Sequence, residues 1–330
     1  MEDAHSTILE FSTEDPSGFF AVFDGHGGQN AAKYAAAHLH QRIRKDATYG
    51  RGEYKDAIKS GFLGVDYDLK TAVAALITPD NRIFVGNAGD SRSVLSQAGI
   101  VKDLSTDHKP GNPSEAERIT KAGGFIEYGR VNGNLALSRA IGDFEFKQNH
   151  RLPAEEQIVT ADPDITEHSM EEGDEFLIVA CDGIWDCLTS QEAVTEVSKL
   201  IAEGKSLGEV CELIMEQCLA RDSDSSGVGC DNMTIVVVAL LNGKTYEEWQ
   251  TGIAARVAEE SSTETNDKST QDSALIVPSI VPASESEPAS DNLPSEESTQ
   301  EEAAEEEAAN AEAKEEEASA TLEETETASN

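Results

Sequence analysis

The stretch Phe19-Phe20-Ala21-Val22-Phe23-Asp24-Gly25-His26-Gly27-Gly28 places an aspartate directly behind a short apolar run. Five apolar residues in succession predict a strand that is buried on both faces. An ionised carboxylate at the end of such a strand is costly unless something compensates its charge. The glycines after Asp24 let the backbone approach a ligand closely, and the carbonyl of Gly25 can itself bind a hard cation. This stretch therefore indicates a strand that ends at a cation site.

Three further blocks repeat the arrangement at distant points of the chain. They place Asp90, Asp182 and Asp231 beside apolar runs, in Val85-Gly86-Asn87-Ala88-Gly89-Asp90-Ser91-Arg92, Phe176-Leu177-Ile178-Val179-Ala180-Cys181-Asp182-Gly183 and Gly229-Cys230-Asp231-Asn232-Met233-Thr234. One aspartate after a strand is weak evidence, because many such residues are helix caps or turn residues. Four of them, two in Asp-Gly, indicate a shared site for Mg²⁺ or Mn²⁺, which prefer carboxylate, carbonyl and water oxygens.

These blocks resemble the metal-dependent protein phosphatases, the protein phosphatase 2C family of serine/threonine phosphatases. The resemblance covers residues 1–242 in order and takes in Met1-Glu2-Asp3-Ala4-His5, residues 103–110, 115–119 and 137–143, and Gly183-Ile184-Trp185-Asp186. From the residues alone, the mixed runs of helices and strands indicate an α+β protein. The resemblance implies two central antiparallel β-sheets sandwiched between helix pairs, with the metal ions at one end of the sandwich.

The resemblance also implies a set of direct metal ligands. Asp24 is expected to bridge two Mn²⁺ or Mg²⁺ ions, the Gly25 carbonyl to bind one of them, and Asp182 and Asp231 to complete the ligand set. Taken alone, Asp24 could belong to an Asp-Gly turn and Asp231 to a side-chain turn. The oxygen-only set disfavours zinc, which would be expected with thiolates or a histidine pair.

Further residues match weaker positions of the family. Asp90 and Asp186 match a third metal position, although both could instead orient the direct ligands through hydrogen bonds. Glu2, Asp3 and Thr71 match positions that hold metal-bound waters. These five residues are therefore expected around the direct ligands.

The resemblance implies hydrolysis without a covalent intermediate on the protein. Two ions lower the pKa of a bridging water and direct it in line at the phosphorus of phosphoserine or phosphothreonine. His26 is expected to donate a proton to the leaving oxygen, because imidazole titrates near neutrality. The alternative is a structural histidine bonded to a carboxylate. Arg92 and Arg139 are expected to be structural, through buried pairs with Asp residues such as Asp143.

The sequence departs from the family pattern at two places. Relatives carry a strand and a phosphate-binding arginine upstream of the stretch that matches Met1, and a longer segment before Thr71. With neither present, we expect Glu2 and Asp3 to be held poorly, since chain ends fray. A pseudophosphatase, which binds phosphoproteins or partners without turnover, is therefore the alternative to an enzyme.

We expect three parts in the chain. The resemblance implies a phosphatase domain at 1–242, composition separates a tail at 259–330, and residues 243–258 form a helical or linker extension between them. The tail holds 22 acidic against 2 basic residues, a net charge of −20, while the whole chain carries −39. It consists mostly of Glu, Ala, Ser and Thr and contains no aromatic residue. Such a segment buries too little apolar surface to offset its ordering entropy, so we expect disorder.

The remaining composition narrows the partners and the compartment. The acidity disfavours nucleic acid and anionic membranes, which attract basic patches. The five cysteines show no paired spacing, which favours free thiols. No apolar run is long enough for a transmembrane segment, and no leader opens the chain. By elimination we expect a protein of the cytoplasm, the nucleus or both. The resemblance implies phosphorylated proteins as its substrates, and we expect a monomer.

Local patterns predict the main elements. Strands are expected at residues 19–24, 72–78, 82–88, 92–96, 176–181 and 233–241. Helices are expected at 29–46, 53–69, 114–122, 190–203 and 207–221, with capping boxes at Ser114/Glu117 and Thr189/Glu192. Pro79-Asp80-Asn81 is expected to form the hairpin turn between two of the strands.

Overall fold

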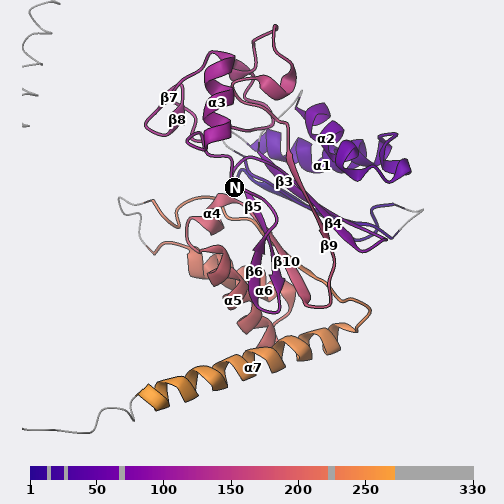
Figure 1. Cartoon of the computed structure of the whole chain (residues 1–330), viewed down its shortest axis with the longest axis vertical. Coiled ribbons are helices and arrows are strands. Elements are labelled where there is room, and N and C mark those ends of the chain that lie inside the picture. The colour runs from indigo at the N-terminus through magenta and orange to yellow at the C-terminus, as the bar shows by residue number, and fades with distance from the viewer. Residues whose placement is uncertain (13–15, 26–28, 67–70, 222–226, 272–330) are drawn as a thin grey trace, which may run out of the picture. The chain divides into compact units, whose positions relative to one another are not determined.

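Two antiparallel sheets form the centre of the molecule in a computed structural model that describes residues 1–12, 16–25, 29–66, 71–221 and 227–271 (Figure 1). The first sheet has the strand order β1 (Ala4–Ile8), β2 (Gly18–Phe23), β3 (Ala72–Thr78), β4 (Arg82–Ala88) and β9 (Asp164–Ser169). The second has the order β11 (Ile235–Ala239), β10 (Asp174–Ala180), β5 (Arg92–Gln97) and β6 (Ile100–Asp103). The predicted α+β fold with two antiparallel sheets is confirmed.

Strand β2 explains why the sheets stack. Successive side chains of a strand point to opposite faces. Phe19, Ala21 and Phe23 pack with the helices on the outer face, whereas Phe20 and Val22 pack between the two sheets. All five are buried, as the continuous apolar run predicted. The carboxyl end of β2 is thereby held at the end of a closely packed sandwich.

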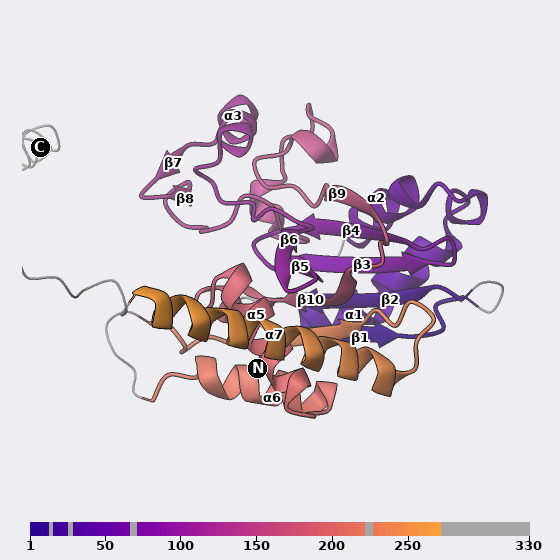
Figure 2. The same ribbon diagram turned by 60° about the horizontal axis from the view of Figure 1, so that its bottom comes forward.

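Each sheet has its own helical cover. Helices α1 (Gln29–Lys45) and α2 (Tyr54–Val65) pack on the first sheet, with a 3₁₀ turn at Tyr49–Arg51 between them. Helices α5 (Ser190–Ala202), α6 (Leu207–Cys218) and α7 (Tyr246–Gln271) lie on the second-sheet side of the molecule (Figure 2). Trp249 and Ile253 of α7 are buried in this second core, so α7 belongs to the folded body.

A smaller substructure lies beyond one end of the sheets. Helix α3 (Pro113–Ala122) and the hairpin of β7 (Ile126–Glu127) and β8 (Arg130–Val131) lie together there (Figure 1). They share a small apolar core with Phe146 and Val159. Two 3₁₀ turns, Phe144–Phe146 and Ala154–Glu156, lie in the segment that returns the chain to β9.

The first residues of α3 and α5 show which of the two predicted capping boxes is present. The capping box of Thr189 and Glu192 is present at α5. The box predicted at Ser114 is wrong, because α3 begins one residue earlier at Pro113, whose fixed φ suits the first helical position. A box at Ser206 and Glu209, which the sequence reading missed, starts α6.

The carboxyl-terminal end of the described chain is helical. Helix α7 continues past residue 258, so it crosses the boundary that composition placed between the extension and the acidic tail. The predicted tail beyond residue 271 lies outside the described residues. Within the described parts of the chain, no helix has the length and apolar character needed to cross a membrane.

Candidate metal centre

Three carboxylates from distant parts of the chain meet at one end of the sandwich. Asp24 follows β2, Asp90 follows β4, and Asp182 follows β10 as the first residue of the short helix α4 (Asp182–Trp185). One oxygen from each lies within 4.8 Å of the others. The three strands end close together, β2 and β4 in one sheet and β10 in the other, and this brings together residues that are far apart in the sequence. The arrangement is suited to a hard divalent cation.

Burial and neighbouring negative charges raise the proton affinity of Asp24 and Asp182. Burial and the negative charges of Asp182, Asp3, Asp90 and Asp231 raise the pKa of Asp24 to about 8. Burial raises the pKa of Asp182 to about 6, with further contributions from Asp90 and Asp231. Such shifts arise where like charges share a site without enough cations.

Two buried oxygens show that this cluster suits a cation. Oδ1 of Asp3 and Oδ1 of Asp90 are buried and have no hydrogen-bond partner among the described residues. A buried carboxylate oxygen without a partner costs free energy, and a divalent ion or its bound water would satisfy both atoms. The donor set contains only oxygen, which fits Mg²⁺ and Mn²⁺.

The amino-terminal residues are held in place, in contrast to the predicted fraying. Strand β1 pairs with β2 over its full length. Asp3 is only 7% exposed and accepts a hydrogen bond from the Thr234 hydroxyl at 2.8 Å. The backbone N–H of Glu2 donates to Asn232 Oδ1 at 2.8 Å. The prediction of a frayed start was wrong because contacts with residues 232 and 234, remote in sequence, hold this end.

Close backbone packing surrounds the aspartates. The buried Thr71 hydroxyl donates to the Asp24 carbonyl at 3.1 Å. A Cβ at Gly25 would lie 2.3 Å from the Glu2 carbonyl oxygen, and a Cβ at Gly183 would lie 2.1 Å from the Asn232 carbonyl oxygen. Glycine at these two positions therefore allows separate segments to meet beside the carboxylates.

The other predicted site residues occupy different places. Asp231 is exposed and outside the three-carboxylate group, but its charge acts on both Asp24 and Asp182. Asp186 is exposed at the end of α4, and its charge raises the pKa of Asp182. His26 lies outside the described residues, so the structure gives no position for the predicted general acid.

The two arginines make extensive ion pairs. Arg92 forms two hydrogen bonds to the Asp107 carboxylate, at 2.9 and 2.7 Å, and lies over the Trp185 ring. Arg139 pairs with Glu115 at 2.7 Å and with Asp164 at 2.6 Å. These contacts fit the structural role that was predicted for both. The partner Glu115 was not anticipated.

The sequence reading also missed Lys109, which lies at the carboxylate group. Its Nζ is 2.6 Å from Asp90 Oδ2. Lys109 belongs to the stretch 103–110 that carried the family resemblance, but its type alone gave no reason to place it at a metal centre. Asn232 and Thr234, which hold the amino-terminal residues, were likewise not singled out.

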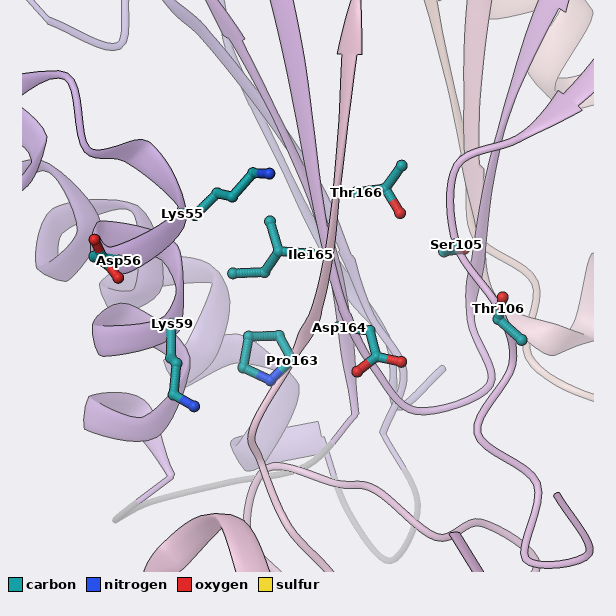
Figure 3. A pocket seen from close by; sticks show the side chains of 9 residues that line it. All are labelled: Lys55, Asp56, Lys59, Ser105, Thr106, Pro163, Asp164, Ile165 and Thr166. Carbon is teal, nitrogen blue, oxygen red and sulfur yellow. The ribbon is translucent and has the colours of Figure 1, made fainter. Parts of the chain in front are cut away.

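A separate cavity of about 420 Å³ lies between α2 and the start of β9 (Figure 3). Lys55 and Lys59 project from α2 toward β9 in this view. Lys55 pairs with Glu167 at 2.9 Å, and Lys59 pairs with Asp162 at 2.9 Å. Because both ammonium groups are compensated, the cavity offers a phosphate group little net attraction, and the carboxylate group remains the candidate centre.

Comparison with known proteins gives one consistent result. The family model described as protein phosphatase 2C matches residues 1–227. Protein phosphatase 2C homolog 2 of Schizosaccharomyces pombe is 50% identical over 273 residues, which cover 78% of this chain and 74% of that protein. Protein phosphatase 2C homolog 2 of Aspergillus fumigatus is 47% identical over 281 residues, covering 78% of this chain and 66% of the relative.

Solved structures share the fold. A Caenorhabditis elegans sex-determining protein superposes with a TM-score of 0.63 at 24% identity, covering 77% of this chain and 64% of that one. A serine-threonine phosphatase 2C from Toxoplasma gondii gives 0.59 at 19% identity, covering 72% of this chain and 94% of that one.

Proposed function

Because this chain belongs to the protein phosphatase 2C family, the metal-dependent serine/threonine protein phosphatases, we propose that its carboxylate centre hydrolyses phosphoserine and phosphothreonine monoesters in proteins. The observation that carries this proposal is the meeting of Asp24, Asp90 and Asp182 within 4.8 Å. The buried, unpartnered oxygens of Asp3 and Asp90 support it, because they are positioned to serve a cation or its water.

In this proposal the metal ligands are Asp24, Asp182, Asp231 and the carbonyl of Gly25, which hold two Mn²⁺ or Mg²⁺ ions. Asp90 and Asp186 serve a weaker third ion. When bound, the ions supply charge neutralisation for the phosphoryl group and lower the pKa of the attacking water.

The surrounding residues of the chain position this centre. Glu2, Asp3 and Thr71 stand around the direct ligands, and the Asp3 oxygen without a partner can accept a hydrogen bond from a water. His26 donates the proton that the leaving serine or threonine oxygen requires.

Cys181, the cysteine beside Asp182, is poorly suited to act as a nucleophile. Burial and the nearby Asp3 and Asp24 charges raise the pKa of Cys181, so this thiol stays neutral and is a poor nucleophile. All five cysteines are free, which suits a reducing compartment. We propose a monomer of the cytoplasm, the nucleus or both, with phosphorylated proteins as substrates.

The test is Mn²⁺-dependent phosphate release from a phosphothreonine peptide by the full chain. Asp182→Asn and Asp231→Asn should each lower kcat by orders of magnitude at limiting Mn²⁺, because each loses a ligand charge and keeps its shape. Asp56→Asn is the matched control, an exposed carboxylate of α2 outside the centre. Unchanged rates in either site variant would remove that residue from the centre. Mn²⁺ binding by the wild type without phosphate release would favour a pseudophosphatase.

A further inference from the structure

Lys109 is paired with one of the clustered carboxylates. Its Nζ lies 2.6 Å from Asp90 Oδ2, and the Asp90 side chain is only 5% exposed. Among the described residues, no other lysine, arginine or histidine forms an ion pair with Asp24, Asp90 or Asp182. The Lys109 ammonium is therefore the positive charge that pairs with this group of three carboxylates.

We propose that Lys109 is an internal counter-cation that competes with Mn²⁺ or Mg²⁺ for Asp90 and so sets how readily the centre takes up metal. This inference rests on the metal centre of the proposed function. In it Lys109 is a positioning residue, because it acts through Asp90, which is proposed to serve the weaker third ion and which lies within 4.8 Å of the direct ligands Asp24 and Asp182.

Charge alone makes the competition unavoidable. An ammonium at 2.6 Å from one Asp90 oxygen and a divalent ion among oxygens that lie within 4.8 Å of one another would be close neighbours of like sign. Their repulsion lowers the affinity for the ion, although solvent screens part of it because the Lys109 side chain is half-exposed. On metal uptake the ammonium therefore either moves away from Asp90 or stays and lowers the affinity of the centre for the metal.

The structure provides a place for the ammonium to go. Lys109 lines a cavity of about 330 Å³ that also contains Asp103 and Asp107, whose carboxylates can accept its hydrogen bonds. The Lys109 side chain is 46% exposed, so water can hydrate its ammonium as it leaves Asp90. The backbone nearby is fixed, because the N–H of His108 donates to the Gly89 carbonyl at 2.9 Å. The exchange thus requires a change of side-chain rotamer only.

The two states differ in a way that experiment can separate. Without metal, Lys109 offsets the repulsion among the carboxylates and stabilises the fold. With metal, the same charge opposes the ion. Removing the charge should therefore destabilise the metal-free protein and strengthen metal binding, whereas the loss of a metal ligand weakens binding.

The test is isothermal titration calorimetry of the full chain, stripped of metal with EDTA and dialysed, against MnCl₂. Lys109→Met should bind Mn²⁺ about tenfold more tightly than the wild type, a rough figure for one partly screened like charge. Lys109→Arg keeps the charge and should stay near wild-type affinity. Lys121→Met is the matched control, because Lys121 pairs with Glu117 on the surface of α3. Thermal unfolding should show Lys109→Met with a lower Tm without metal and a larger rise on adding Mn²⁺.

The outcomes are distinguishable. Equal or weaker Mn²⁺ binding by Lys109→Met would overturn the inference and leave the proposed function intact. Absence of Mn²⁺ binding by the wild type would overturn the metal centre itself, and the inference with it. Should Lys109→Met fail to fold, Lys109→Gln provides the same comparison with a hydrogen-bonding side chain in place of the charge.

Discussion

The backbone of α4 meets a distant segment at Gly183. Gly183 lies against Asn232. Asp182 directly precedes Gly183, and Asp231 directly precedes Asn232. The contact therefore holds two proposed ligands at a set spacing. A Cβ at Gly183 would lie 2.1 Å from the Asn232 carbonyl oxygen, and backbone atoms on both sides cannot yield as a flexible side chain would.

Gly183→Ala should lower the free energy of unfolding by about 3 kcal/mol, the upper range for overpacking, and weaken Mn²⁺ binding. Gly208→Ala is the control, because a Cβ there meets no atom within 4 Å and the residue lies in helix α6. It should be neutral or stabilising by about 0.5–1 kcal/mol. Urea unfolding and Mn²⁺ titration measure both effects. Similar behaviour of the two variants would contradict the close contact.

At the scale of elements, α3 is anchored by one buried carboxylate. Glu115 is 2% exposed and accepts hydrogen bonds from Arg118, Arg139 and Ser138 at distances of 2.6–3.2 Å. Arg139 continues to Asp164, the first residue of β9. The network therefore ties the substructure of α3 to the edge of the first sheet.

Glu115→Gln should lower the free energy of unfolding by about 3–5 kcal/mol, because two largely buried guanidinium groups lose their shared carboxylate charge. Glu117→Gln is the control on the same helix. Its exposed pair with Lys121 should contribute less than about 1 kcal/mol. Chemical denaturation of both variants at neutral pH makes the comparison. Equal losses would show that Glu115 is not the anchor.

The same carboxylate gives the fold a pH dependence. Burial alone would raise the pKa of Glu115, but the hydrogen bond from Arg139 and the charges of Arg118 and Arg139 outweigh it and lower the pKa to about 2 from the ordinary value of 4.5. A lowered pKa stabilises the fold above pH 4.5, and this contribution is lost as the pH falls toward 2. The stability gap between wild type and Glu115→Gln should therefore narrow from pH 5 to pH 3 in urea unfolding. A constant gap would contradict the shift.

At the scale of the molecule, the acidic end of the chain contains a structural helix. Trp249 of α7 is 4% exposed, and its ring N–H donates to the Glu175 carbonyl at 2.7 Å. Arg256 forms an ion pair with Glu175 at 2.7 Å. Helix α7 thus completes the second core, while residues 272–330 continue the acidic composition.

Trp249→Ala should cost about 3–5 kcal/mol of unfolding free energy, the usual loss for a large buried aromatic. Removal of residues 272–330 should leave both stability and Mn²⁺-dependent hydrolysis of a small aryl phosphate nearly unchanged, because the composition of this segment, rich in Glu, Ala, Ser and Thr, offers little apolar surface to bury. Thermal unfolding measures the stability of both variants, and steady-state kinetics measures the activity of the shortened chain. A tenfold loss of activity on shortening would mean that this segment supports the body.

Much of the fold could be predicted from local pattern. The apolar run of residues 19–23 predicted β2, and the Thr189/Glu192 box predicted the start of α5, because burial and capping leave a short-range signal. Strand β9 was missed because Glu167 and His168 interrupt its apolar character, and it forms through pairing with β4.

The sequence by itself determined which residues could bind a hard cation: aspartates placed where apolar strands end, two of them before glycine. Only the tertiary structure decided which ones meet. It gathers Asp90 with Asp24 and Asp182, and it places Lys109 against Asp90. It also holds Asp3 through Thr234, 231 residues away. Side-chain partners of this kind depend on how the two sheets stack, and sheet stacking is set by the whole apolar core, which no local pattern records.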